Sequence, residues 1–314
     1  MNEAMNRSAR TLLLATANLR GIMLMMVARL IFAGSDTFTK LATESLPASE
    51  VLVVRNSIAL PIVCFMAWRL GGLRHIGAIR DRVVMTRSVV EGLGTVAFVV
   101  ALPFVMLGQS TVILLTVPII LVALSAIIYK EDVGWRRWTA IIVGFGGVIM
   151  VAGPFGDRAT FFLLLTQVTA VLWAIRDLMT SRIVGRIPSV TVALITTAVV
   201  GLLALPGALW QEWRWLGGQE ILFLLGSGSL VAIANFLYID ALRTGAISVV
   251  APFRYTGALW ATVAGFLVWG DIPDVLGIIG TVFIIGSGLY TFYRELELAK
   301  ARRVPPPLAG EGGA

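Results

Sequence analysis

The feature that most constrains this chain is a succession of apolar runs, each about 20 residues long, separated by short polar turns. A helix of about 20 mostly apolar residues is long enough to cross the hydrocarbon core of a membrane. Because lipid offers the backbone no hydrogen-bond partners, each run is predicted to be a helix. Ten such runs follow one another along the sequence, at 21–42, 48–69, 82–104, 107–129, 135–153, 159–182, 189–210, 219–241, 245–269 and 272–293.

The composition excludes an ordinary soluble fold. Hydrophobic residues make up 58% of the 314 positions, and charged residues only 14%. Soluble domains average about 45–50% apolar and about 25% charged residues. A soluble fold of this size could not bury so much apolar surface, so lipid must cover part of it. We therefore expect an all-α integral membrane protein.

The positive charges are distributed unevenly between the two sides of the predicted membrane. Of the 25 Lys and Arg residues, seventeen lie on the side of the N-terminus, five lie inside the apolar runs, and three lie on the opposite side: Lys40, Arg158 and Arg214. Cytoplasmic loops carry an excess of Lys and Arg. The asymmetry predicts ten transmembrane helices with both termini in the cytoplasm, and it explains the net charge of +7 without a nucleic-acid partner.

A pattern in the second half of the chain repeats one in the first half. In both, an apolar run ends in an acidic turn that a Gly-rich run follows, and 140 residues separate Glu131 from Asp271 and Gly146 from Gly286. The pattern predicts two five-helix repeats, 21–153 and 159–293, flanked by a cytoplasmic segment 1–20 and a disordered cytoplasmic tail 294–314. Because five is odd, the second repeat would enter the membrane inverted, a recurrent plan of secondary transporters. Alternatively, small residues in these runs merely permit close helix packing.

With these features the chain resembles the drug/metabolite transporter superfamily, in its EamA-type ten-helix group. The resemblance covers about residues 21–293. It rests on Asp36 with Lys40 in the first run, Arg55 in the second, and the stretch from Pro118 to Lys130-Glu131-Asp132 before a Gly-rich run. Gly270-Asp271 departs from the Gly-Glu that the family often has there. The resemblance implies a secondary carrier or exporter for metabolites such as amino acids, nucleotide-like compounds or vitamins, or for drugs.

Eight ionisable side chains fall inside the predicted helices, where a charge is costly and usually faces a cavity or a partner. Three of them, Arg29, Glu91 and Arg254, lie about 12–14 Å from the cytoplasmic ends of their helices at 1.5 Å per residue. Half the hydrocarbon core is about 15 Å. These three helices, drawn from both halves, therefore predict a pocket near the membrane midplane. The eight are Arg29, Asp36, Arg55, Arg87, Glu91, Arg176, Asp177 and Arg254.

The chemistry of these side chains suggests how such a pocket would act. Arg29 and Arg254 can donate paired hydrogen bonds to a carboxylate or phosphate, and Glu91 can balance them, receive an amine or carry a proton. Trp173, Tyr238 and Tyr255 can form apolar or cation–π walls. The candidate substrate-binding or coupling residues are Arg29, Asp36, Lys40, Arg55, Arg87, Glu91, Trp173, Arg176, Asp177, Asn235, Tyr238, Arg254 and Tyr255.

A structural interpretation of the same charges remains open. Arg87 with Glu91, and Asp36 with Lys40, are spaced i, i+4 and can neutralise each other along one helix. Arg254 can bond carbonyls freed near a kink at Pro252. Pro61, Pro118 and Pro252 are candidate hinges. Five Arg against three carboxylates inside the runs favour an anionic or zwitterionic solute over a lipophilic cation.

The sequence favours transport over catalysis. One Cys and one His cannot build a disulfide framework or a His/Cys metal site, and there is no GxxxxGK[ST] motif. We expect a secondary transporter of the inner membrane, without cofactor or metal, that carries a small polar metabolite such as an amino acid. Protons or another ion are possible coupling partners, and the protein is expected to be a monomer or homodimer. The alternatives are an exporter of drugs or lipophilic cations, a membrane-embedded enzyme with a carboxylate-only site, and a ligand sensor.

Overall fold

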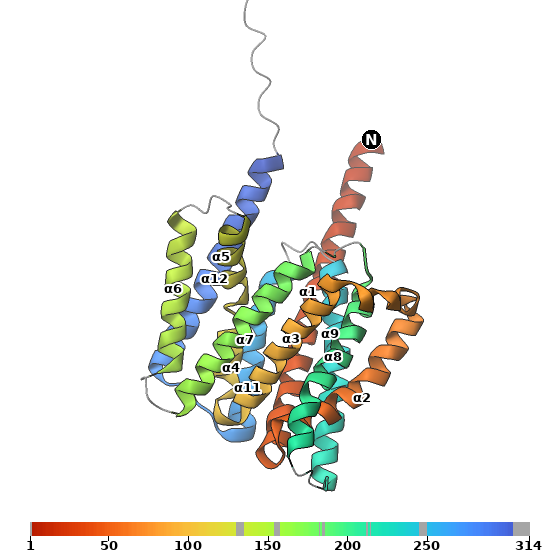
Figure 1. Cartoon of the computed structure of the whole chain (residues 1–314). Helices are drawn as coiled ribbons and strands as arrows, with labels where there is room; N and C mark the ends of the chain where they lie inside the picture. The colour runs from red at the N-terminus through yellow and green to blue at the C-terminus, as the bar shows by residue number, and fades with distance from the viewer. Residues whose placement is uncertain are drawn as a thin grey trace, which may run out of the picture.

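The computed structural model is a bundle of helices (Figure 1). It describes residues 2–129, 135–153, 158–181, 183, 186–211, 213, 215–244 and 250–303, and these residues contain no strands. In chain order the elements are α1 (Asn2–Ser45), α2 (Ala48–Arg69), η1 (Gly72–Arg80), α3 (Arg82–Ala101), η2 (Leu102–Phe104), α4 (Leu107–Leu114), α5 (Val117–Tyr129), α6 (Trp135–Ala152), α7 (Arg158–Ser181), α8 (Ser189–Trp210), α9 (Gly218–Thr244), η3 (Ala251–Tyr255), α11 (Thr256–Trp269) and α12 (Val275–Arg303).

Within the described residues, eight helical stretches are long and apolar enough to cross a membrane. They lie in α1, α2, α3, α4 with α5, α7, α8, α9 and α12. The remaining two predicted crossings correspond to shorter apolar helices, α6 and α11. Large apolar side chains such as Leu209 and Leu267 face outward with 76% and 74% of their surface exposed, as expected where lipid covers the protein.

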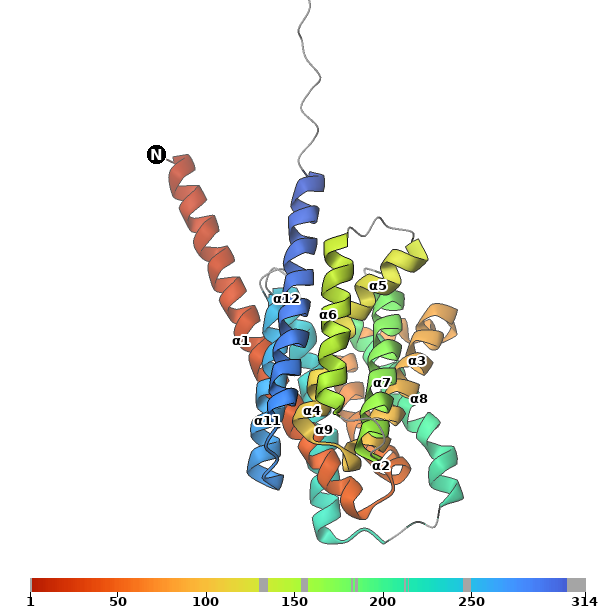
Figure 2. The same cartoon turned by 90° about the vertical axis from the view of Figure 1, so that its left-hand side faces the viewer.

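The first helix begins and the last helix ends on the same side of the bundle. The start of α1 and the end of α12 lie together at one end of the bundle in both views (Figures 1 and 2). We call this the terminal end and its opposite the far end. A chain that crosses the membrane an even number of times begins and ends its crossings on the same side.

The predicted helix at 107–129 is divided in two. Helix α4 ends at Leu114 and α5 begins at Val117. Pro118 has no N–H, so the carbonyl of Leu114 cannot receive the hydrogen bond that would continue the helix. At the break the carbonyl of Ile113 accepts from both the backbone N–H of Thr116, at 3.0 Å, and the Thr116 hydroxyl, at 2.7 Å.

A second break falls in the other half of the chain. Of the predicted helix at 245–269, residues 245–249 lie outside the described ones, and the rest is the 3₁₀ helix η3 followed by α11. Pro252 stands at the start of η3, where its missing N–H removes no helical bond. Both breaks thus lie beside a proline that the sequence singled out.

The predicted disordered tail begins too early. Helix α12 continues to Arg303, so residues 294–303 are helical and only 304–314 lie outside the described residues. The sequence from Glu295 to Ala301 explains this, because Glu, Leu, Ala and Lys are strong helix formers. Likewise, α1 is already helical within the predicted N-terminal segment 1–20.

The helix packing has an internal symmetry. The main pairs are α1 with α9, α3 with α7, α2 with α8, and α6 with α12. Exchanging α1 with α7, α2 with α8, α3 with α9 and α6 with α12 turns the first pair into the second, and leaves the last two unchanged. The pairs α2–α9 and α3–α8 exchange in the same way. The two halves of the chain therefore pack on each other through equivalent surfaces.

The contact between α6 and α12 shows the same symmetry at the level of single residues. A side chain added at Gly144 would meet Ser287 at 2.8 Å, and one added at Gly147 would meet Ile284 at 2.9 Å. A shift of 140 residues converts one pair into the other. The residue numbers run in opposite directions along the two helices, so α6 and α12 are antiparallel. Glycine at these positions lets the backbones approach closely.

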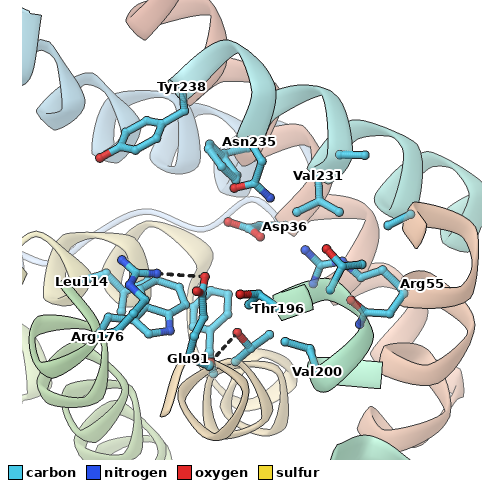
Figure 3. Close-up of a pocket in the computed structure, with 18 of the residues that line it drawn as sticks. Asp36, Arg55, Glu91, Leu114, Arg176, Thr196, Val200, Val231, Asn235 and Tyr238 are labelled. Atoms are coloured by element: carbon cyan, nitrogen blue, oxygen red, sulfur yellow. Dashed lines mark hydrogen bonds and ion pairs between the residues drawn. The ribbon is translucent and has the colours of Figure 1, made fainter. Parts of the chain in front are cut away.

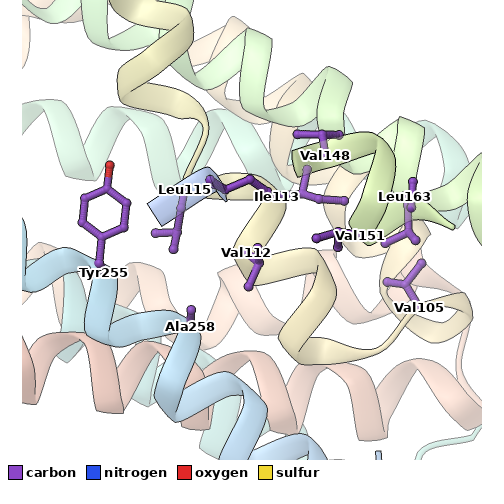
Figure 4. Packing of buried hydrophobic residues seen from close by; sticks show 11 residues of the cluster. Val105, Val112, Ile113, Leu115, Val148, Val151, Leu163, Tyr255 and Ala258 are labelled. Carbon is purple, nitrogen blue, oxygen red and sulfur yellow. The ribbon is translucent and has the colours of Figure 1, made fainter. Parts of the chain in front are cut away.

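A buried apolar cluster joins the two breaks. Val112, Ile113 and Leu115 at the first break pack with Tyr255 and Ala258 at the second, and with residues of α6, α7 and α12 (Figure 4). Fully buried side chains of this size are closely packed and fix the positions of their neighbours. The backbone on either side of both breaks is thereby held against the opposite half of the molecule.

Candidate functional site

A cavity lies between the two halves of the bundle (Figure 3). Its walls come from α1, α2, α3 and the α4–α5 break in the first half, and from α7, α8, α9 and η3 in the second. Helices α6, α11 and α12 contribute no lining residue. The lining residues are Arg29, Phe32, Asp36, Arg55, Asn56, Ala59, Val63, Glu91, Thr95, Phe98, Thr111, Leu114, Leu115, Val117, Trp173, Arg176, Thr196, Thr197, Val200, Val231, Ala232, Asn235, Tyr238 and Arg254.

The cavity brings together most of the ionisable groups that the sequence placed inside helices. Six charged side chains line it, four Arg and two carboxylates. The three deep charges, Arg29, Glu91 and Arg254, are among them although they come from α1, α3 and η3. Trp173, Asn235 and Tyr238 also line the cavity. The other four candidates, Lys40, Arg87, Asp177 and Tyr255, do not.

On the wall formed by α3 and α7, the charges are paired. Glu91 receives Arg87 at 2.6 Å and Arg176 at 3.0 Å. Arg176 also contacts Asp177 at 2.8 Å. Arg87 in addition donates to the hydroxyls of Thr180 and Thr196. We call Arg87, Glu91, Arg176 and Asp177 the paired network; its charges sum to zero, and the predicted i, i+4 pair Arg87–Glu91 belongs to it.

The remaining four charged groups of the cavity are not paired in this way. Arg29, Asp36, Arg55 and Arg254 make no ion pair within 4 Å among the described residues. Asp36 lies in the middle of the cavity, with Arg55 on one side and Tyr238 on the other (Figure 3). It acts electrostatically on Arg55 more strongly than on Arg29.

Arg29 and Arg254 approach each other where α1 passes η3 and α11. The guanidinium of Arg29 lies against Gly257, one turn after Arg254, and a side chain at position 257 would overlap it. Among the described residues, the buried Nε of Arg29 has no hydrogen-bond partner. Tyr238 acts electrostatically on both guanidinium groups. Two cations from different halves of the chain therefore share one corner of the cavity.

The uncharged lining combines aromatic rings with amides and hydroxyls. Phe32 lies 5.7 Å beneath the guanidinium of Arg29 and stacks edge-on with Tyr238, and Phe98 packs against Trp173. Phe32 is not among the residues predicted from the sequence, although its spacing from Arg29 and Asp36 places all three on one helix face. The threonines of the lining carried no such signal, because a Thr in a membrane helix commonly bonds its own backbone, as Thr95 and Thr111 do.

Lys40 belongs to another cluster, at the far end of the bundle. Its Nζ donates to the carbonyl of Val105 at 2.9 Å, lies 3.6 Å from Asp271, and sits 4.3 Å above the ring of Trp269. Trp269 in turn donates to Glu44 at 2.5 Å. The predicted i, i+4 pair Asp36–Lys40 is therefore wrong. The left-handed turn at Gly270 (φ 70°) carries the chain between α11 and α12 and brings Asp271 within reach of Lys40 instead.

Tyr255 faces away from the cavity. It belongs to the buried cluster of Figure 4, and its hydroxyl lies against Gly288 of α12. Successive residues of a 3₁₀ helix are rotated by about 120°. Arg254 and Tyr255 therefore cannot both point inward, and the prediction of Tyr255 as a lining residue is wrong.

The three predicted hinge prolines have different surroundings. Pro61 lies inside α2, which continues unbroken around it, whereas Pro118 and Pro252 lie at the two helix breaks. Pro206 lies inside α8 and was not selected. Their roles as hinges stay predictions.

A bundle of apolar helices around a polar cavity is the architecture of a multi-pass membrane protein that handles a solute. The profile of the EamA-like transporter family matches residues 19–153 and again 160–293. The chain belongs to the EamA-like transporter family, within the drug/metabolite superfamily, and is a small-molecule transporter rather than an enzyme.

Relatives of known name carry different solutes. The chain is 28% identical to a riboflavin transporter of Vibrio cholerae, over 91% of this chain and 96% of that protein. It is 24% identical to an S-adenosylmethionine uptake transporter of Rickettsia felis, over 84% and 89%. It is 22% identical to a pseudopaline exporter of Pseudomonas aeruginosa, over 84% and 93%.

Among solved structures that match the chain is one with a similar fold. It is titled only as the crystal structure of a protein, and it matches with a TM-score of 0.61 and 18% sequence identity. The match covers 90% of this chain and 99% of that chain. At this identity the likeness concerns the fold alone.

Proposed function

We propose that this protein is a secondary transporter that carries a small anionic or zwitterionic metabolite across the inner membrane through the cavity between its two halves. The observation that carries the proposal is the cavity itself. It is enclosed by helices of both halves, and its charged lining has a surplus of two positive charges. A charge inside a membrane helix usually marks a solute or ion pathway.

The proposed topology has ten crossings, arranged as two inverted repeats with both termini in the cytoplasm. In this arrangement α6 crosses as a short helix, and η3 crosses together with α11. The exchange symmetry of the helix pairs, the antiparallel contact of α6 with α12, and the two matches of the family profile support it. The excess of Lys and Arg on the side of the termini supports the cytoplasmic orientation.

The class of solute follows from the charges and not from the relatives. Riboflavin, S-adenosylmethionine and pseudopaline differ in charge, so the names of the relatives do not select among them. The cavity offers four guanidinium groups against two carboxylates. A cation would have to compete with these Arg residues for Asp36 or Glu91, whereas a carboxylate or phosphate would find unpaired donors.

The Lys40 cluster suggests how the transport cycle is gated. It joins α1 and Val105, which lies between η2 and α4, to the turn between α11 and α12, so it ties one half of the chain to the other at the far end. Opening of the pathway at that end requires these contacts to break. The helix breaks at Pro118 and Pro252, which border the cavity, are the proposed hinges, with Pro61 as a third.

The proposal is tested by solute flux into proteoliposomes that contain the purified protein and no nucleotide. The panel comprises riboflavin, riboflavin 5′-phosphate, S-adenosylmethionine, neutral and acidic amino acids, and the lipophilic cation tetraphenylphosphonium. We expect saturable uptake of at least one anionic or zwitterionic compound, accelerated when the same compound is loaded inside. Protein-free liposomes are the control. Saturable uptake of tetraphenylphosphonium alone would instead make the protein an exporter of lipophilic cations.

The coupling ion is tested in the same vesicles. A proton gradient or a sodium gradient of either direction is imposed, and the initial rate of uptake is compared with that in its absence. Acceleration by one gradient identifies that ion as the coupling partner. Equal rates under all gradients identify a carrier that is driven by the solute gradient alone.

A further inference from the structure

The charges of the cavity can be assigned to partners one by one. Glu91 and Asp177 are bonded to Arg87 and Arg176 in the paired network. Asp36 acts electrostatically on Arg55 more strongly than on Arg29, so we assign it to Arg55. Asp177 also acts on Arg254 electrostatically, but its own ion pair is with Arg176.

After this assignment, two guanidinium groups are left without a carboxylate among the described residues. Arg29 and Arg254 both line the cavity, and neither makes an ion pair. An uncompensated charge in a protein interior is destabilising, and more so when a second charge of the same sign lies near it. The surplus of two positive charges is therefore located at one corner of the cavity.

That corner has the features of an anion site. The guanidinium group of Arg29 is held in place from behind by Gly257 and from below by the ring of Phe32. Its Nε lies against Gly257 and has no hydrogen-bond partner among the described residues, so a solute in the cavity would contact the other N–H groups of this guanidinium. Tyr238 adds a hydroxyl that can donate to an anion, and a guanidinium group presents its N–H donors in a fork that matches two oxygens of one acid group.

We propose that Arg29, Arg254 and Tyr238 bind a dianionic head group of the solute, either a phosphate monoester or two neighbouring carboxylates. This inference rests on the proposed function and narrows its solute class. A head group with two negative charges neutralises the surplus, whereas a single carboxylate leaves one charge uncompensated. The rest of the solute extends toward Asp36, Asn56 and the aromatic pair Phe98–Trp173.

The site also connects solute binding to the movement of the two halves. Arg29 lies on α1 in the first half, and Arg254 lies on η3, directly after the helix break in the second. A dianion held by both therefore bridges the halves beside a proposed hinge. An anion that contacts both guanidinium groups favours the arrangement of the two halves in which these groups are close together. A solute that contacts only one of the two groups favours this arrangement less.

The experiment compares matched compounds that differ in one acid group. Binding to the purified full-length protein in nanodiscs is measured for serine and phosphoserine, and for succinamate and succinate. The first pair tests a phosphate monoester and the second tests two neighbouring carboxylates. We expect at least one dianion to bind at least about tenfold more tightly than its partner. The pair that shows the preference identifies which dianion the site takes.

The variants Arg29→Gln and Arg254→Gln assign that preference to the site. Each is expected to reduce the preference by at least about tenfold, while Arg254→Lys retains part of it. The exposed Arg80→Gln is the matched control and keeps the full preference. A monodisperse elution profile and an unchanged or raised melting temperature show that a variant is folded.

Two outcomes overturn the inference. One is equal affinity for both members of both pairs, and the other is a preference that survives both Gln variants. Neither outcome touches the proposed function as long as the proteoliposomes show saturable uptake of a monovalent anion or a zwitterion. A failure of the proposed function is recognised separately, by the absence of saturable flux for every anionic and zwitterionic compound tested.

Discussion

Buried arginines on two walls of the same cavity differ in whether they have carboxylate partners. On the wall of α3 and α7, Arg87 and Arg176 share Glu91, and Arg176 also contacts Asp177. On the wall of α1 and η3, Arg29 and Arg254 have no carboxylate within 4 Å among the described residues. Both walls consist of apolar helices that carry buried arginines. The type of residue is the same, and the partners differ.

This difference distinguishes charges that stabilise the fold from charges that we expect to bind the solute. In the paired network each removed group leaves a buried partner behind, so its loss should harm the fold. At Arg29 and Arg254 no protein partner is left behind, so their loss should harm solute binding and spare the fold. Stability and binding are therefore expected to respond in opposite ways to substitutions on the two walls, and this contrast can be tested.

The largest effect on stability is expected for Glu91→Gln. The substitution keeps the shape of the side chain but leaves Arg87 and Arg176 with one carboxylate between them. Breaking a buried ion pair in this way costs about 3–5 kcal/mol. Because the Glu91 side chain is 21% exposed, we expect the lower end of that range. The melting temperature of the purified variant measures the loss.

A charge-balanced double variant is the control for this prediction. Arg87→Gln combined with Glu91→Gln removes one positive and one negative charge and leaves Arg176 paired with Asp177. We expect it to recover more than half of the lost stability, because coupled groups are not additive. A melting temperature of Glu91→Gln within a degree of the unmodified protein would show that the network contributes nothing to the fold.

The second effect has the opposite sign. Without solute, Arg29→Gln and Arg254→Gln should each stabilise the protein, because each removes an uncompensated buried charge. The gain should be toward the lower end of about 1–4 kcal/mol, since water in the cavity already solvates part of each group. Thermal unfolding with and without the preferred dianion measures it. A loss as large as that of Glu91→Gln would place both Arg residues in the structural class.

The third effect concerns the far end of the molecule and is expected for Lys40→Met. This change removes the ion pair with Asp271 and the contact with the ring of Trp269. A cation–π contact contributes about 0.5–2 kcal/mol depending on its exposure. We therefore expect a shift of the resting population toward a state open at the far end, by about threefold to tenfold.

Labelling from the far end measures that shift. In a Cys64→Ser background, a cysteine introduced at Thr111 in the cavity is exposed to a membrane-impermeant maleimide. Lys40→Met should speed the reaction, and Lys40→Arg, which keeps the charge, should leave it close to the original rate. Identical rates in all three proteins would mean that the Lys40 cluster does not control access.

The sequence predicted the helical membrane architecture and the depth of the buried charges, because both follow from one dimension. The length of apolar runs and the rise per residue place Arg29, Glu91 and Arg254 at one level, and the structure puts all three on one cavity. The partners of the charges depend on contacts between distant helices. Asp271 lies 231 residues after Lys40, and no local spacing could select it over Asp36.

The errors have the same origin. Tyr255 was predicted to form an aromatic wall of the cavity, but in the structure its side chain leaves η3 toward α12, a direction that the apolar pattern does not indicate. For Glu91 the sequence left several roles open, among them balancing Arg29 and Arg254 or pairing with Arg87, and the structure shows ion pairs with Arg87 and with Arg176. Only the three-dimensional assignment shows which charges remain for a solute.

The smallest effect tests the geometry of the corner that holds Arg29 and Arg254, without changing any charge. In Gly257→Ala the added methyl group overlaps the guanidinium of Arg29. Since this is the end of a flexible side chain, it can move, and we expect a loss of dianion affinity of about threefold to tenfold with little change in stability.

Gly146→Ala is the matched control, because nothing lies within 4 Å of the added methyl there. Both changes place Ala where a helix favours it over Gly, so a difference in dianion affinity between them reports the position of Arg29 alone. Equal affinities would show that the exact position of the Arg29 guanidinium is unimportant for dianion binding. Only its charge would then explain the binding.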